Sequence, residues 1–382
     1  MPMTRIRLTF AVLAAFVALA SPAHAEILVG VAGPMSGPNA ALGEQLKRGV
    51  ERAIDDINAT GGLRGERLAL RVADDGCEPR KAVDVATEFV AAGVKFVAGH
   101  YCSGSSIPAS KVYEAADIVQ ISPASTNPKF TDEGGWNVLR ICPRDDAQGT
   151  AAGSLITRRF AGEKVAILSD QSPAATAIAA KAREALAAAA ITPVADETYK
   201  PGAKAYPELV QRLGDAAADV VYFAGTYVEG GIIIRGLREL GSTAQFITAD
   251  GLVTDDFWNI AREAGEGTLM TFMFDPQKFQ TATPVLQRFR DDDYNPEGHT
   301  LYAYAAVQAW VQAAEATGGS DSRRIAEWLK AGNTVRTVTG DIAFDARGDL
   351  KSPRFSWFRW SDGKYLEVDP ETLNQPPPEP NP

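Results

Sequence analysis

Two short segments that are rich in hydroxyl side chains each follow a predicted strand. Residues 103–106 (SGSS) come after the strand predicted at residues 94–98 and precede a helix that we expect to begin near Pro108. Residues 124–126 (AST) follow the next predicted strand. Hydroxyls beside the unpaired N–H groups of a helix N-terminus can hold an anion such as a carboxylate without any arginine. The same hydroxyls would also suit simple turn caps, so both interpretations stay open at this point.

One acidic side chain offers the complementary charge. Asp250 directly follows residues 246–249, which we predict to be a strand. A carboxylate at that position could pair with an ammonium group, or it could cap a turn or a helix, which is the commoner role of an aspartate at a strand end. If the hydroxyl segments and Asp250 face each other, they suit a small zwitterion.

The cysteines and histidines show no catalytic or metal-binding pattern. Cys77, Cys102 and Cys142 allow three pairings, and an odd number leaves one thiol over. A bridge between Cys77 and Cys102 would close a loop of about 26 residues, worth roughly 3.5 kcal/mol in the chain-entropy account. His100 and His299 are far apart in sequence and suggest no metal set. No nucleophile–base arrangement stands out either, so we expect neither an enzyme nor a cofactor.

The elements that must position these residues alternate between strand and helix. Strands are predicted at residues 27–32, 68–72, 94–98 and 119–121 and, in a second series, at 165–168, 220–223 and 246–249. Helices are predicted at residues 46–57, 82–89, 151–160, 174–190, 230–240 and 301–316. This repetition is typical of parallel sheets with helices on both faces. We therefore predict an α/β protein with two doubly wound lobes and a cleft between them.

The N-terminus has the layout of a secretory signal peptide. Arg5 and Arg7 precede the apolar run 8–20, and residues 23–25 (AHA) form a small-residue cleavage site. The apolar run is too short to span a bilayer. We expect cleavage after Ala25, and because no cysteine follows that site, we expect no lipid anchor. The chain is predicted to be exported and released.

Composition limits the partners of the mature chain. The formal charge of −10 becomes −12 once the two arginines of residues 1–25 are removed. An acidic protein is a poor candidate for nucleic acid or an anionic membrane surface. The remaining length exceeds that of a usual single core, which favours two domains. The proline-rich residues 371–382 are predicted to be a disordered tail.

Several short motifs together resemble one known family. In their order and spacing they are similar to periplasmic solute-binding proteins of the branched-chain amino acid (leucine/isoleucine/valine) ABC transporter type, over nearly the whole chain. The motifs are residues 33–38 (GPMSGP), 57–62 (INATGG), 74–77 (DDGC), 99–103 (GHYCS), 121–126 (ISPAST) and 348–351 (GDLK). The resemblance implies a type I periplasmic binding fold. Two lobes joined by three segments would close around an amino acid and pass it to a membrane permease.

The resemblance also implies specific lobes and residues. The N-terminal lobe would comprise residues 26–144 plus 275–351, and the C-terminal lobe residues 145–274 plus 352–370. Cys77 would pair with Cys102 and leave Cys142 over, with no assigned role. A periplasmic monomer without a cofactor is expected. The implied ligand contacts are Tyr101, Ser103, Ala124, Ser125, Thr126, Thr226 and Asp250.

This chain departs from the leucine-binding members at the walls of the site. Leu42, Ala174 and Thr226 stand where those members carry tyrosines, and Tyr101 replaces a smaller aliphatic residue. Asp250 is one methylene shorter than the usual glutamate. We therefore expect a ligand that is bulkier than leucine or chemically different from it. The alternative is a periplasmic sensor or binding protein for an amide, a urea, or a small carboxylate or aromatic acid. A secreted hydrolase is disfavoured because no catalytic set is visible.

Overall fold

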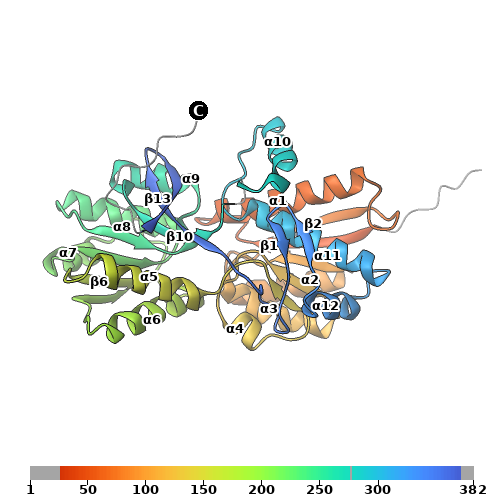
Figure 1. Cartoon of the computed structure of the whole chain (residues 1–382), viewed down its shortest axis with the longest axis horizontal. Helices are drawn as coiled ribbons and strands as arrows, with labels where there is room; N and C mark the ends of the chain where they lie inside the picture. The colour runs from red at the N-terminus through yellow and green to blue at the C-terminus, as the bar shows by residue number, and fades with distance from the viewer. Residues whose placement is uncertain (1–25, 276–277, 371–382) are drawn as a thin grey trace, which may run out of the picture.

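The protein consists of two lobes, each built around one sheet. The structure is a computed structural model that describes residues 26–275 and 278–370. The predicted signal peptide (residues 1–25) and the predicted tail (residues 371–382) lie outside the described residues. Figure 1 shows the lobes side by side with three segments of chain running between them. The predicted α/β architecture of two lobes joined by a three-segment hinge is confirmed.

The first lobe contains a five-stranded sheet in the order β2-β1-β3-β4-β5, and all neighbouring strands are parallel. Alternate residues of a strand point to opposite faces, so Val29 and Val31 join one apolar cluster whereas Ala32 joins another. Both faces of the sheet are therefore buried. The strands are β1 (Ile27–Gly33), β2 (Leu68–Asp74), β3 (Phe96–Gly99), β4 (Val119–Ser122) and β5 (Val138–Arg140).

Helices cover both faces of this first sheet. α1 (Ala40–Ala59) and α11 (Thr300–Thr317) pack together on one face, and α2 (Pro79–Ala91) and α3 (Ser103–Ala115) pack on the other. α11 therefore returns to the first lobe although it lies far along the chain, next to α1 (Figure 1). The smaller elements of this part are α4 (Lys129–Asp132), α10 (Thr283–Asp291), α12 (Ser322–Lys330), β11 (Val335–Thr337) and β12 (Gly340–Ile342).

The second lobe contains a seven-stranded mixed sheet in the order β14-β13-β10-β9-β8-β6-β7. Its strands β6 to β10 run parallel, as predicted for this fold class, whereas β13 and β14 add an antiparallel hairpin at one edge. The strands are β6 (Val165–Ser169), β7 (Ala195–Thr198), β8 (Val220–Ala224), β9 (Gln245–Thr248), β10 (Leu269–Met273), β13 (Phe355–Ser361) and β14 (Lys364–Val368). The helices are α5 (Asp145–Arg159), α6 (Pro173–Ala188), α7 (Pro207–Asp215), α8 (Tyr227–Glu239) and α9 (Asp255–Ala261).

One predicted boundary near the site is wrong. The helix expected to begin near Pro108 begins at Ser103, and the proline lies inside it. A proline removes one backbone hydrogen bond of a helix. The burial of Ala109 and Tyr113 in the core of the first lobe outweighs that loss. The earlier start brings the helix N-terminus directly to the hydroxyl segment.

Candidate functional site

A cavity of about 350 Å³ lies between the two lobes. Its walls come mainly from loops that follow the C-terminal ends of strands, which is where α/β sheets bind ligands. The structure brings most of the predicted site residues together in this one cavity. Tyr101, Ser103, Ala124, Thr126, Thr226 and Asp250 all line it.

Ser103 lies at the wall that the first lobe contributes. It is the first residue of α3, and its Oγ accepts a hydrogen bond from the backbone N–H of Asn127 at 3.1 Å. The hydroxyl proton of Ser103 is therefore free to be donated to a ligand. The first N–H groups of a helix have no partner within it, and Ser103 and Gly104, the first two residues of α3, both line the cavity. This wall is rich in donors and suits a carboxylate.

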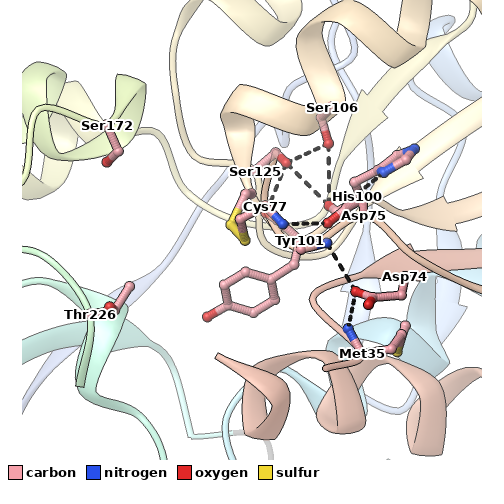
Figure 2. Close-up of a disulfide and its surroundings, with 12 residues drawn as sticks. Met35, Asp74, Asp75, Cys77, His100, Tyr101, Ser106, Ser125, Ser172 and Thr226 are labelled. Carbon is pink, nitrogen blue, oxygen red and sulfur yellow. Dashed lines mark hydrogen bonds and ion pairs between the residues drawn. A yellow bond between two sulfur atoms is a disulfide. The ribbon is translucent and has the colours of Figure 1, made fainter. Parts of the chain in front are cut away.

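Ser125 lies behind the cavity wall rather than among the residues that line it. Its side chain is fully buried, and its Oγ lies 2.7 Å from the Oγ of Ser106. Figure 2 shows these two serines together, set back from the ring of Tyr101. Their neighbour Ser122 uses its Oγ to accept the backbone N–H groups of Ala124 and Ser125 at 3.2 and 2.9 Å. A direct ligand contact by Ser125 remains a prediction.

Asp250 supplies the negative charge from the second lobe. It begins a short 3₁₀ helix (Asp250–Leu252) after β9, and its Oδ2 accepts from Nε2 of Gln148 at 3.3 Å. Burial raises the pKa of Asp250 to about 6, while the hydrogen bond from Gln148 opposes that rise. A Cβ on Gly251 would lie 2.1 Å from the carbonyl oxygen of Gly225. This glycine thus lets the turn of Asp250 pack against the loop that carries Thr226.

Of the three positions that differ from the leucine-binding pattern, two line the cavity and one does not. Ala174 and Thr226 line the cavity, whereas Leu42 is buried within α1 and does not. The adjoining loop instead contributes Asn39. Tyr101 is only 8% exposed, and its hydroxyl lies 3.3 Å from Nδ1 of His299. Figure 2 shows the ring of Tyr101 extending towards the loop of Thr226 in the opposite lobe.

Asp170 and Ser172 line the cavity, and the sequence reasoning missed them together with Asn39. Asp170 directly follows β6, as Asp250 follows β9, so the same strand-end signal was present for both. Oδ1 of Asp170 accepts from the backbone N–H of Ser172 at 2.8 Å, and burial raises the pKa of Asp170. Ser172 caps α6 by accepting from the N–H of Ala175. Among the described lining residues, none is Lys, Arg or His.

The disulfide forms another part of the wall. Cys77 and Cys102 are bonded, which confirms the pairing that the family resemblance implied, and both line the cavity. Cys142 is free and buried, and burial raises the pKa of its thiol well above the ordinary range.

Within residues 26–275 and 278–370, no group of three or more His, Cys, Asp or Glu could hold a metal ion. In the same ranges no helix has the length and apolar character needed to cross a membrane.

Two α/β lobes that enclose such a cavity, with donors on one side and an acid on the other, define a two-lobed solute-binding protein. The chain belongs to the periplasmic binding protein family, whose model matches residues 26–364. This confirms the family that the sequence motifs indicated.

Named relatives come from several bacteria. A Leu/Ile/Val-binding protein homolog of Brucella suis is 41% identical over 356 residues, covering 92% of this chain and 96% of the relative. The branched-chain amino acid transporter substrate binding protein of Streptococcus pneumoniae, solved with isoleucine, has a TM-score of 0.82 at 25% identity and covers 90% of this chain and 99% of its own. An ABC transporter substrate-binding protein of Desulfitobacterium hafniense, solved with Leu, has a TM-score of 0.72 at 28% identity, with coverages of 90% and 100%.

Proposed function

We propose that this protein is the substrate-binding component of an ABC importer and captures an α-amino acid in the interlobe cavity. The observation that carries the proposal is that Ser103, Thr126 and Asp250 line one cavity from opposite lobes. Ser103, the N-terminus of α3 and Thr126 would bind the carboxylate, and Asp250 would bind the ammonium group. The ligand would then hold the two lobes closed by its higher affinity for the closed state.

The side chain of the ligand would occupy the part of the cavity near Ala174 and Thr226. Both residues are small, so they leave room where the leucine-binding members are expected to carry tyrosines. Tyr101 narrows the cavity from the other lobe. The relatives named above support an amino acid, and the changed walls favour one that is bulkier than leucine or chemically different from it.

The remaining parts of the proposal concern location and partners. We infer export with cleavage after Ala25, release into the periplasm as a monomer, and delivery of the ligand to a membrane permease without catalysis. We also infer the lobe limits given above, residues 26–144 plus 275–351 and residues 145–274 plus 352–370. The packing of α11 against α1 and the pairing of β13 with β10 support this division.

A ligand screen followed by calorimetry tests the amino acid proposal. A thermal-shift screen of the twenty standard L-amino acids, with amides and aromatic acids alongside, should give stabilisation by at least one amino acid, about 2.7 kcal/mol at 100 times its Kd. Asp250→Asn should then raise the Kd for that amino acid by more than about tenfold, because a buried charge partner is lost. Asp255→Asn, on the neighbouring α9 and outside the cavity, should leave the Kd unchanged. Stabilisation by amides or aromatic acids alone would contradict the proposal.

A further inference from the structure

Three polar side chains lie buried directly behind the donor-rich wall. Asp75 follows β2, His100 follows β3, and Tyr113 belongs to α3. All three have 0% exposure, and none of them lines the cavity. Nδ1 of His100 lies 2.6 Å from Oδ2 of Asp75, and Nε2 lies 2.8 Å from the hydroxyl of Tyr113. We call this set the Asp75–His100–Tyr113 chain.

The hydrogen-bond directions in this chain follow from the groups themselves. With Asp75 as the carboxylate and His100 as the neutral imidazole, the carboxylate only accepts, so Nδ1 is assigned as the donor to Asp75. In the neutral ring Nε2 must then accept, and the Tyr113 hydroxyl is its donor. Burial, and then the charge of Asp75, raise the pKa of Tyr113, so its hydroxyl keeps the proton it donates. Both ring nitrogens are thus satisfied, and the orientation of the imidazole is fixed from two sides.

The backbone of His100 connects this chain to the second donor loop. Its carbonyl oxygen accepts from Oγ of Ser122 at 2.7 Å, and the hydroxyls of Ser125 and Ser106 lie at 3.2 and 3.3 Å from it. Ser122 in turn accepts the N–H groups of Ala124 and Ser125. The carbonyl group of His100 is therefore one anchor of the loop that ends at Thr126, and Arg140 is another, since its Nη1 donates to the carbonyls of Ser125 and Asn127. Figure 2 shows Ser106 and Ser125 converging on the carbonyl of His100.

Asp75 connects the same chain to the disulfide loop and to β1. Its Oδ1 accepts the backbone N–H of Cys77 at 2.8 Å, and its own N–H donates to the carbonyl of Gly33 at 3.0 Å. Cys77 is bonded to Cys102, which is the N-cap residue of α3. The carboxylate of Asp75 is therefore held by the loop of Cys77, and the disulfide of that loop fixes the start of α3.

We propose that Asp75, His100 and Tyr113 are positioning residues for the carboxylate of the ligand. The proposal rests on the proposed function, because it assumes that Ser103, the N-terminus of α3 and Thr126 bind that carboxylate. By fixing the His100 peptide group, the chain holds the two donor loops in the geometry of the bound state before the ligand arrives. Preorganised donors bind more tightly because less freedom is lost on binding.

Tyr113→Phe is the mildest variant that breaks the chain. It removes the donor to Nε2 of His100 and leaves the ring packing of α3 in place. The readout is calorimetric affinity for two probes: the amino acid that stabilises the protein most in the twenty-member screen, and the α-carboxamide of that amino acid. We expect Tyr113→Phe to weaken binding of the amino acid by up to roughly tenfold, the upper range for the loss of one hydrogen bond. Binding of the carboxamide should weaken much less, so the ratio of the two affinities, which measures the preference for a carboxylate over a carboxamide, should fall.

Two further variants separate positioning from general destabilisation. Tyr304→Phe removes a partly buried tyrosine hydrogen bond, from Tyr304 to Asp56 at 2.8 Å, between α11 and α1 of the same lobe. It should change neither affinity. His100→Asn keeps a donor for Asp75 but cannot also reach Tyr113, and it should reproduce the lost carboxylate preference.

Each result decides between the proposals. Suppose that an amino acid binds, and that Tyr113→Phe and His100→Asn prefer the carboxylate as strongly as Tyr304→Phe does. The positioning role is then overturned, while the proposed function stands. If no amino acid binds the unmodified protein, the proposed function fails, and the positioning role falls with it.

Discussion

At the scale of single residues, Asp250 should make ligand binding dependent on pH. Its pKa is about 6 because it is buried, and an ammonium group needs its ionised form. Because the pKa of the Asp250 carboxyl is raised in the ligand-free protein, the affinity for the amino acid should be highest above pH 7. It should fall as the pH drops through 6 and the carboxyl becomes protonated. At pH 5 only about a tenth of such a carboxyl is ionised, so the Kd should be about tenfold weaker than at pH 7.5. Calorimetry at the two values measures this.

Asp145 and the cavity-lining Asp170 are the other carboxyls to consider in that experiment. Burial, and then the charge of Asp250, raise the pKa of Asp145 well above its ordinary value. Asp250→Asn should bind weakly and give nearly the same Kd at pH 5 and pH 7.5. A tenfold pH effect that survives in Asp250→Asn would assign the dependence to another group.

The strand-end rule accounts for which site residues could be predicted. It pointed to Ser103, Thr126 and Asp250 because the loops after parallel strands meet at one edge of a sheet. It did not distinguish Ser125, whose side chain points into the protein, from its neighbours on the cavity wall. Asp170 carries the same strand-end signal as Asp250, since it directly follows β6. Adjacent loop residues can face opposite ways, and only the folded backbone decides between them.

At the scale of elements, the disulfide should matter most for the start of α3. Cys77 and Cys102 are 25 residues apart, and Cys102 is the N-cap of that helix. Replacing both cysteines with serine should lower the free energy of unfolding by roughly 3.5 kcal/mol, because the open loop gains entropy in the unfolded chain. Urea unfolding monitored by circular dichroism measures the change. Dithiothreitol should lower the stability of the natural protein and leave the double serine variant unchanged; equal stabilities without reductant would contradict the expectation.

The long elements of the strand–helix repeat were predictable, because such patterns have clear periods, whereas β5, β7, β10 and several short helices were not expected. The antiparallel hairpin of β13 and β14 was not. Pairing of β13 with β10 depends on where the third crossover returns to the second lobe, and no local pattern in residues 355–368 encodes that return. The early start of α3 was missed for a related reason, since Pro108 is a local breaking signal and the core packing that overrides it is not local.

At the scale of the whole molecule, the two lobes also touch through direct hydrogen bonds from one to the other. The hydroxyl of Tyr227, in α8 of the second lobe, donates to the carbonyl of Pro38 in the first. Nδ2 of Asn127 donates to the carbonyl of Pro173 at 2.7 Å, also across the lobes. Such bonds belong to the closed arrangement, so they should contribute to ligand affinity without touching the ligand.

Tyr227→Phe should therefore speed the release of the ligand. Its hydroxyl is not needed inside either lobe, and a hydrogen bond of this kind contributes about 0.5–1.5 kcal/mol. The Kd for the best amino acid of the screen should rise by about three- to tenfold, mostly through a faster dissociation rate measured by stopped-flow fluorescence. The unfolding temperature without ligand should change little, because each lobe keeps its own core.

Tyr206→Phe is the matched control for that measurement. Tyr206 also donates its hydroxyl to a backbone carbonyl, that of Lys200 at 2.8 Å, but both residues belong to the second lobe. Its loss costs a hydrogen bond without changing how the lobes meet, so the dissociation rate should stay at the natural value. Equal rates in Tyr227→Phe and Tyr206→Phe would mean that the cross-lobe bond does not hold the closed state. The affinity would then depend on the ligand contacts alone, with Ser103, Thr126 and Asp250 bridging the lobes through the bound molecule.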